Sequence, residues 1–308
     1  MDQKAILMKI LLLGSNGQLG KELERQLSEV GTLEAFSRSL LDITNYKLVK
    51  DTVGLINPNI IINAAAYTAV DKAEDDQEKA YAINSDAVAN LAQIAKTEDA
   101  LLIHYSTDYV FDGTKPTPYL ESDLTKPINV YGASKLAGEQ AITKVNCKHL
   151  IFRTTWIIGK DGPNFAKTII RLASERSRLD IISDQLGVPT SPSLIAKVTV
   201  DAIQAKKKKR EWPKGIYHLA PRGVSSWYEI AQTLLNFAKH YHIQQNFSVK
   251  VIQAIATEDY PTAAKRPLNS QLDTNKISMQ LSFKLPYWKE DFLAVTKEIL
   301  EDFRQNET

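Results

Sequence analysis

The segment KILLLGSNGQLG, residues 9–20, decides the fold. Its first five residues form an apolar run typical of a buried strand, and Gly14, Gly17 and Gly20 follow directly. Glycines placed there let the chain turn tightly, approach a pyrophosphate, and begin a helix whose N-terminal amides attract the phosphate charge. The spacing is GxxGxxG, whereas the common dinucleotide fingerprint is GxGxxG. Because strand, turn and helix coincide, the segment favours dinucleotide binding over a purely structural turn.

The rest of the N-terminal half repeats this alternation of strand and helix. Strand-like apolar runs lie at 9–13, 33–36, 60–63, 101–105 and 149–153. Helical patterns lie between them at 19–29, 46–56, 78–96 and 134–145. Near-continuous apolar strands separated by helices indicate a parallel sheet covered on both faces. The sequence therefore predicts an α/β fold with a Rossmann-type, doubly wound parallel sheet.

The second half has a different texture, because prolines divide it into shorter pieces. Strands are expected at 181–182 and 216–219, and helices at 194–205, 226–238 and 288–303. This pattern favours a smaller lobe interleaved with late Rossmann elements. We expect an NAD(P)-binding Rossmann domain over residues 1–157, with contributions from about 188–220, and a C-terminal substrate-binding lobe formed by 158–187 and 221–308.

Composition and charge exclude several classes of protein. The 308 residues include 38 Lys and Arg against 36 Asp and Glu, so no global field would recruit nucleic acid or an anionic membrane. Cys147 is the only cysteine, which excludes an intramolecular disulfide and a multi-cysteine metal site. No apolar stretch approaches the roughly 20 residues that span a bilayer. We therefore expect a cytoplasmic location and neither a nucleic-acid nor a membrane partner.

The residues after the second predicted strand indicate which dinucleotide is bound. An acid at that place would favour NAD, whereas an arginine accommodates the 2′-phosphate of NADP. The chain has Ser37 and Arg38 there, and its next acid is Asp42. NADPH is therefore favoured, with NADH use also allowed, and an exposed loop position is the alternative for Arg38. Asp42 and Ile43 could border the adenine, and the small residues 64–66 after Asn63 leave room for the dinucleotide.

A second chemical signal is YGASK, residues 131–135. Tyr131 and Lys135 are four residues apart, so they share one face of a helix. The ammonium would lower the pKa of the phenol from its usual value near 10, and so make it a usable proton donor. Ser106 and Thr107 follow the fourth strand, where a hydroxyl can bond the same carbonyl oxygen. A packed tyrosine and a surface lysine are the structural alternatives.

These motifs belong to segments that together resemble the dTDP-4-dehydrorhamnose reductase family of extended short-chain dehydrogenases/reductases. The segments are GSNGQLG (14–20), NAAAYTAVDKAE (63–74), HYSTDYVF (104–111), NVYGASKLAGE (129–139), FRTTW (152–156), NFAKT (164–168), DQLGVPT (184–190) and RPLNS (266–270). The first and fourth are common to the superfamily, whereas the second and third are more specific to this reductase. The resemblance runs through nearly the whole chain.

The resemblance implies reduction of the C4 keto group of dTDP-4-dehydro-L-rhamnose to dTDP-L-rhamnose by NADPH, in deoxysugar biosynthesis for cell-surface polysaccharide. The catalytic residues it implies are Thr107, Tyr131 and Lys135. The expected cofactor-binding residues are Gly14, Asn16, Gly17, Gln18, Leu19, Gly20, Arg38, Asp42, Ile43, Asn63, Ala64, Ala65, Ala66, Ser106, Tyr131 and Lys135. The expected substrate-binding residues are Thr68, Val70, Thr107, Trp156, Asn164 and Arg266.

One feature of the family is incomplete in this chain. Some members dimerise around a magnesium ion held by glutamates, and Glu22 and Glu298 match two of those positions, whereas Ser193 stands at a third. A missing carboxylate weakens a site for a hard cation. No metal is therefore predicted, Mg²⁺ is doubtful, and the oligomeric state stays open, a homodimer included.

Three rival functions share parts of the same pattern. A nucleotide-sugar dehydratase needs a second carboxylate after Asp108, where this chain has Tyr109. A 4-epimerase retains NAD, which the absence of an acid at position 37 disfavours. A non-catalytic regulatory subunit, like that of methionine adenosyltransferase, could keep the nucleotide fold without turnover. The complete set of Thr107, Tyr131 and Lys135 favours a reductase over all three.

Overall fold

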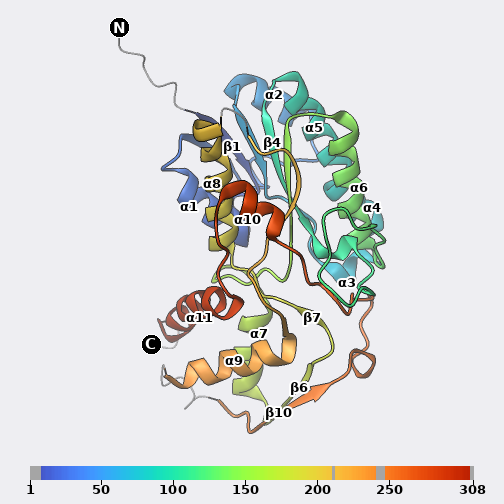
Figure 1. The fold of residues 1–308 in the computed structure, drawn as a ribbon, viewed down its shortest axis with the longest axis vertical. Helices are drawn as coiled ribbons and strands as arrows, with labels where there is room; N and C mark the ends of the chain where they lie inside the picture. The colour runs from blue at the N-terminus through green and yellow to red at the C-terminus, as the bar shows by residue number, and fades with distance from the viewer. Residues whose placement is uncertain (1–7, 210–211, 241–246, 306–308) are drawn as a thin grey trace.

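The computed structural model describes residues 8–209, 212–240 and 247–305. Its centre is a six-stranded sheet with the order β2-β1-β3-β4-β5-β8, and every pair of neighbours is parallel. The six strands are β1 (Lys9–Leu13), β2 (Thr32–Phe36), β3 (Ile60–Asn63), β4 (Leu101–Thr107), β5 (His149–Thr154) and β8 (Gly215–His218). The predicted α/β class and parallel sheet are confirmed (Figure 1).

Helices cover both faces of this sheet, as its strand sequences require. They are α1 (Gln18–Leu27), α2 (Tyr46–Ile56), α5 (Ala87–Thr97), α6 (Val130–Val145), α8 (Pro192–Lys209) and α10 (Asn275–Leu281). The short helices α3 (Val70–Ala73) and α4 (Gln77–Tyr81) pack against α6. In β1, Ile10 and Leu12 pack with α1 and α8, whereas Leu11 and Leu13 pack with α2 and α5. Successive strand residues point to opposite faces, so an all-apolar strand needs two helical layers.

A second, smaller lobe lies beyond the carboxyl ends of the strands (Figure 1). It contains α7 (Phe165–Glu175), α9 (Trp227–His240) and α11 (Trp288–Gln305), with the parallel pair β6 (Arg178–Ile182) and β10 (Val251–Ile255) and the antiparallel pair β7 (Leu186–Gly187) and β9 (Ser225–Ser226). Its core includes Ile170, Leu234 and the fully buried Trp288. This lobe therefore has an apolar core of its own.

Two predicted helices differ from the structure at informative places. The helix expected over 78–96 is interrupted between α4 and α5 by a π-helical turn, η1 (Ala82–Asp86). Helix α6 begins at Val130, four residues before the predicted start, because Asn129 caps it. The Asn129 side chain accepts a hydrogen bond from the Gly132 amide at 2.7 Å. The cap places Tyr131 in the first turn of α6.

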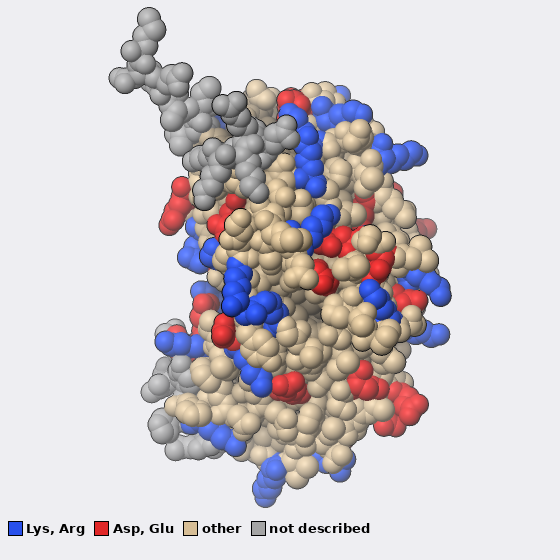
Figure 2. All heavy atoms as spheres, in the orientation of Figure 1, with Lys and Arg blue, Asp and Glu red and all other residues tan. Residues whose placement is uncertain are grey.

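The surface carries mixed charge, as the sequence balance predicts. On the face shown in Figure 2, basic and acidic side chains are interspersed, and no single sign covers a large area. This face therefore presents no extended positive field to a polyanion. Across the described part of the chain, no helix combines the length and apolar character needed to cross a bilayer.

Candidate active site

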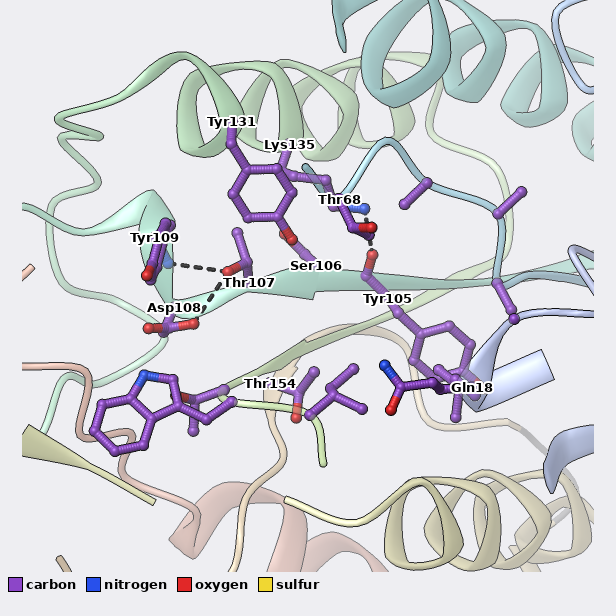
Figure 3. Close-up of a pocket in the computed structure, with 18 of the residues that line it drawn as sticks. Gln18, Thr68, Tyr105, Ser106, Thr107, Asp108, Tyr109, Tyr131, Lys135 and Thr154 are labelled. Carbon is purple, nitrogen blue, oxygen red and sulfur yellow. Dashed lines mark hydrogen bonds between the residues drawn. The ribbon is translucent and has the colours of Figure 1, made fainter. Parts of the chain in front are cut away.

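A cavity of about 470 Å³ opens at the carboxyl ends of the central strands (Figure 3). It is lined by Gly17, Gln18, Leu19, Asn63, Ala64, Ala65, Ala66, Thr68, Tyr105, Ser106, Thr107, Asp108, Tyr109, Tyr131, Lys135, Thr154, Thr155, Trp156, Ile157, Pro163 and Trp227. A second cavity of about 230 Å³ shares Gly17 and residues 64–66 with it. The two cavities therefore adjoin at the glycine turn, at the edge where doubly wound sheets bind ligands.

The glycine turn has the shape that its sequence predicts. Gly14 has φ +81°, and a Cβ there would lie 2.6 Å from the Ala65 amide nitrogen. A Cβ on Gly20 would collide with the Gly14 carbonyl, so these two glycines let the turn pack on β3 and on α1. Gly17 lines both cavities, and a Cβ there would meet only the Gly14 oxygen, at 3.5 Å. Backbone at Gly17 is thus left open to a ligand.

The smaller cavity contains the residues expected to distinguish the dinucleotides. Arg38, Asp42 and Ile43 line it together with Gly14 and Asn16. The Arg38 Nε donates to Asp42 Oδ2 at 3.2 Å, and the Arg38 side chain is 64% exposed. Hydrogen bonds from the Thr44 amide and hydroxyl, and then the Arg38 cation, hold the pKa of Asp42 below its usual value. The exposed Arg38 guanidinium therefore lies at the rim of this cavity, paired with Asp42.

The predicted catalytic hydroxyls converge on the larger cavity. Thr107 ends β4, and its Oγ1 donates to Asp108 Oδ1 at 3.0 Å and accepts from the Tyr109 amide at 3.2 Å (Figure 3). Tyr131 projects from α6 toward Thr107. The Ser106 hydroxyl is buried and has no hydrogen-bond partner. A buried hydroxyl without a partner is costly unless a ligand satisfies it.

The proton donor differs from the prediction in one respect. We expected the Lys135 ammonium to lower the pKa of Tyr131, but burial and the nearby Asp108 carboxylate raise it to about 12, against a lowering by the Thr107 hydroxyl. The prediction is wrong because Lys135 points elsewhere in this structure. A raised pKa keeps the Tyr131 phenol protonated throughout the physiological pH range, as a general acid requires.

Lys135 is buried at the floor of the cavity. Its Nζ donates to the Tyr105 carbonyl oxygen at 2.6 Å and lies 3.4 Å from His104 Nε2. Burial lowers the pKa of Lys135 to about 8, although the Glu139 charge raises it in part. Burial also holds the pKa of His104 well below its usual value, so that imidazole is neutral. Lys135 therefore begins to lose its proton only slightly above neutral pH.

The predicted substrate residues divide into two groups. Thr68 and Trp156 line the larger cavity, whereas Val70, Asn164 and Arg266 do not. Asn164 caps α7 and donates to Gln18 Oε1 at 3.3 Å, which ties that loop to the glycine turn. Arg266 is paired with Asp71 at 2.6 Å. It lines a third cavity, of about 710 Å³, in the C-terminal lobe.

Sequence reasoning missed Trp227, which lines both the first and the third cavity. Its ring stacks on Trp156 with 3.8 Å between centroids, and its Nε1 donates to Gln185 at 3.1 Å. Trp156 has φ +42°, a strained conformation for a bulky residue, as often occurs at functional sites. Trp227 therefore lies at the boundary between the two cavities, and Trp156 stacks on it within the first. No motif marks Trp227, because its partner is 71 residues away in sequence.

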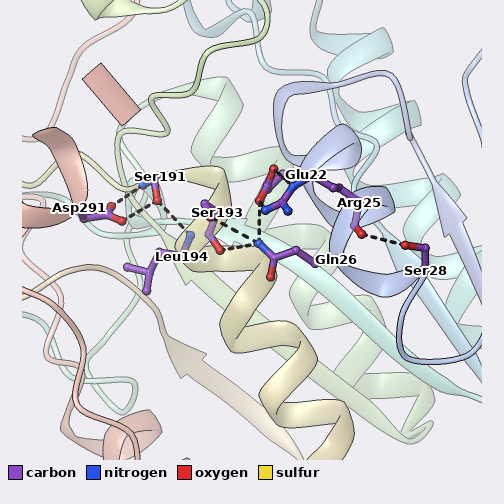
Figure 4. Close-up of polar contacts among 8 residues, drawn as sticks. All are labelled: Glu22, Arg25, Gln26, Ser28, Ser191, Ser193, Leu194 and Asp291. Carbon is purple, nitrogen blue, oxygen red and sulfur yellow. Dashed lines mark hydrogen bonds and ion pairs between the residues drawn. The ribbon is translucent and has the colours of Figure 1, made fainter. Parts of the chain in front are cut away.

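Glu22 and Ser193, two of the three positions considered for a magnesium site, are linked through Gln26 (Figure 4). Glu22 pairs with Arg25 and accepts from Gln26 at 2.7 Å, and Gln26 also donates to the Ser193 carbonyl at 3.2 Å. Glu298 lies on the exposed side of α11. Among the residues that the structure describes, no group of three His, Cys, Asp or Glu side chains is placed to hold a metal ion.

Comparison with known proteins agrees with this geometry. A family model described as the RmlD substrate binding domain matches residues 8–301. The dTDP-4-dehydrorhamnose reductase of Escherichia coli strain K12 is 45% identical over 286 residues, which cover 92% of this chain and 95% of that protein.

Two solved dTDP-4-dehydrorhamnose reductases share the fold. The protein from Bacillus anthracis, solved in complex with NADP, has a TM-score of 0.85 at 37% identity, covering 95% of this chain and 99% of that one. The Clostridium acetobutylicum protein has a TM-score of 0.86 at 36% identity, covering 97% of this chain and 100% of that one. Sequence, fold and site therefore agree that the chain belongs to the dTDP-4-dehydrorhamnose reductase family.

Proposed function

We propose that this chain reduces the C4 keto group of dTDP-4-dehydro-L-rhamnose with NADPH, and so produces dTDP-L-rhamnose for cell-surface polysaccharide. The observation that carries the proposal is the convergence of Thr107, Tyr131 and Lys135 on one cavity that adjoins the glycine turn. A dinucleotide groove placed against a hydroxyl, a phenol and a lysine fits carbonyl reduction. The family relatives support the same reaction.

The residues present fit a bound NADPH. Gly17 leaves backbone open at the turn, and Arg38 and Asp42 border the adjoining cavity. In this proposal residues 14–20 hold the pyrophosphate, 63–66 the middle of the dinucleotide, Arg38 the 2′-phosphate, and Ser106 with Lys135 the nicotinamide end. When bound, the reduced nicotinamide supplies the hydride for C4.

The side chains of the cavity would supply the remaining chemistry. Tyr131 donates the proton to the carbonyl oxygen, since its pKa of about 12 keeps it protonated. Thr107 orients that oxygen by a hydrogen bond. Lys135 supplies positive charge near the phenolate that forms, once it turns from the Tyr105 carbonyl. Trp156 and Trp227 offer apolar faces suited to a deoxysugar.

We propose that the C-terminal lobe, residues 158–187 and 221–308, holds the nucleotide part of the substrate. The third cavity there is lined by Arg176, Arg178 and Arg266, and its apolar walls include Ile169 and Leu179. Guanidinium groups bind phosphates in a bidentate manner, and an apolar wall suits a pyrimidine ring. Because Trp227 borders both cavities, a diphosphate-linked sugar could reach from one into the other.

A coupled assay tests the proposed function. The substrate is generated from dTDP-4-keto-6-deoxyglucose by a 3,5-epimerase, and NADPH absorbance is followed with this protein present or absent. We expect NADPH oxidation that needs both the epimerase and this protein, with dTDP-rhamnose as product. Tight NADPH binding without oxidation would instead support the regulatory reading. The homodimer also stays a prediction, and sedimentation velocity measures it directly.

Replacing Arg38 by alanine tests the cofactor preference. We expect the KM for NADPH to rise by about tenfold or more, because a hydrogen bond to a charged group contributes about 1.5–3 kcal/mol. The KM for NADH should not change, since NADH lacks the 2′-phosphate. Lys50→Ala, an exposed change on the neighbouring α2, is the matched control. Equal losses for both dinucleotides would contradict this role of Arg38.

A further inference from the structure

Asp108 is a buried carboxyl that the reduction described above does not use. It follows Thr107 at the start of the 3-10 turn η2 (Asp108–Val110) and is 3% exposed. It lines the same cavity as Thr107 and Tyr131. Its Oδ1 accepts from the Thr107 hydroxyl at 3.0 Å (Figure 3), and its Oδ2 is buried without a hydrogen-bond partner. A half-satisfied carboxylate at a ligand cavity is costly to keep ionised.

When Asp108 is ionised, the Thr107 hydroxyl donates its only proton to the Asp108 carboxylate. A hydroxyl has one proton to donate and two lone pairs that can accept. The Tyr109 amide occupies one lone pair at 3.2 Å, and the Asp108 carboxylate takes the proton. One lone pair remains, which cannot bond a carbonyl oxygen because both are acceptors. In this state Thr107 can orient no substrate carbonyl.

A neutral Asp108 reverses the direction of this hydrogen bond. The carboxylic acid then has a proton of its own to donate to the remaining lone pair of Thr107. When Thr107 accepts this hydrogen bond, its own proton no longer bonds Asp108. The hydroxyl can then donate that proton to the carbonyl oxygen beside the Tyr131 phenol. We propose that Asp108 is a positioning residue that, as a neutral acid, directs the Thr107 hydroxyl toward the substrate carbonyl. The inference rests on the proposed function and deepens it.

The surroundings of Asp108 favour the neutral form. Burial raises its pKa to about 6, against a lowering by the nearby hydroxyls of Ser270, Thr107 and Thr155. Thr155, directly after β5, and Ser270 thus present hydroxyls to Asp108, and these do not titrate in the working range. The Asp108 charge raises the pKa of two titratable groups, Tyr109 on the same turn and Tyr131 on α6. Both phenols stay neutral in the working pH range.

The sign of the pH dependence follows from these groups. Asp108 is neutral below its pKa, so the active form is lost as the pH rises through about 6. A bound substrate displaces water from the cavity and raises the pKa of Asp108 further. The fall of kcat with rising pH, which we call the Asp108 limb of the pH–rate profile, therefore has its midpoint at or above this value. Lys135, with a pKa of about 8, titrates separately. Per turnover one hydride and the Tyr131 proton are transferred, and Asp108 and Thr107 neither gain nor lose a proton.

The test is the single-turnover rate of NADPH oxidation with the dTDP-4-keto-L-sugar, measured from about pH 5 to about pH 9. In the unaltered protein we expect the rate to fall by about tenfold per pH unit above the midpoint of the Asp108 limb. Asp108→Asn cannot titrate and should lose that limb, while the limb near 8 that belongs to Lys135 remains. Asp75→Asn, the same change at an exposed carboxyl, should keep both limbs.

A second variant separates this role from a through-space effect of the Asp108 charge. Thr107→Val has no hydroxyl to direct, so its residual rate should also lack the Asp108 limb. A limb that persists in Thr107→Val or in Asp108→Asn overturns the inference, as does a rate that rises with pH through the same range. Absence of NADPH oxidation at every pH in the unaltered protein would instead remove the proposed function itself.

Discussion

Replacing Tyr131 by phenylalanine is expected to lower kcat by about 10²- to 10⁴-fold, the range for loss of a general acid. The Tyr131 phenol points toward Thr107 and can donate a proton there. Burial raises its pKa to about 12, which keeps it protonated. NADPH affinity should change little, since the aromatic ring remains in the cavity. The measurement combines steady-state turnover with NADPH titration by fluorescence.

Tyr81→Phe is the matched control for this change, because Tyr81 lies on the exposed side of α4 and outside the described cavities. It should turn over like the unaltered protein. Equal activity of Tyr131→Phe and Tyr81→Phe would remove Tyr131 from its role as proton donor. A loss of NADPH binding in Tyr131→Phe would point to a collapsed groove rather than to a missing proton.

Glu139→Gln is expected to destabilise the protein by about 3–5 kcal/mol, because it leaves a buried cation without its counter-ion. Glu139 on α6 and Arg153 on β5 are 2% and 3% exposed, and they pair at 2.6 Å. Arg153 also packs 5.2 Å from the Phe111 ring centroid. The pair fastens the helix that carries Tyr131 and Lys135 to the sheet. Urea unfolding measures the change.

The exposed pair Arg171–Glu175 on α7 provides the control for that experiment. Its side chains are 60% and 49% exposed, so Glu175→Gln should cost less than about 1 kcal/mol. If the two glutamine variants unfold at the same urea concentration, the buried pair contributes no more than a surface pair. A rate of NADPH oxidation that falls with the stability of Glu139→Gln would link the pair to the placement of α6.

The sheet and the glycine turn could be predicted because their signals are local. An apolar run before Gly14 predicts a strand. Parallel strands end at the same edge of a sheet, so Asn63, Thr107 and Thr154 lie at that edge independently of the loop conformations. The residues at that edge therefore converge as expected. The start of α6 was misplaced because its cap, Asn129, precedes the apolar pattern.

The C-terminal lobe was harder to predict. Helix α7 has buried residues at 166, 169, 170 and 173, a helical spacing that the sequence contains within a short segment between Pro163 and the next strand. Strand β10 could not be found, because it is a half-exposed edge strand that pairs with β6, whose first residue lies 73 positions earlier. Its pairing depends on tertiary contacts and leaves no period in the sequence.

Side-chain direction is the part of the site that sequence could not supply. The four-residue spacing places Tyr131 and Lys135 on one face of α6, yet the Lys135 amine bonds the Tyr105 carbonyl instead of the phenol. Likewise the sequence predicts Arg266 at the substrate but does not indicate its ion pair with Asp71 beside the third cavity. Both outcomes depend on residues that are close only in the folded chain.

Deuteride transfer from NADPH to the sugar is a direct measure of the proposed reduction. NADPH carrying deuterium on the nicotinamide C4 is incubated with the epimerised dTDP-4-keto sugar and this protein, and the sugar product is analysed by mass and by proton NMR. We expect dTDP-rhamnose with one deuterium at sugar C4, formed at a rate that Tyr131→Phe greatly lowers. Recovery of the keto sugar without deuterium, from a protein that still binds NADPH, would contradict the proposed reduction.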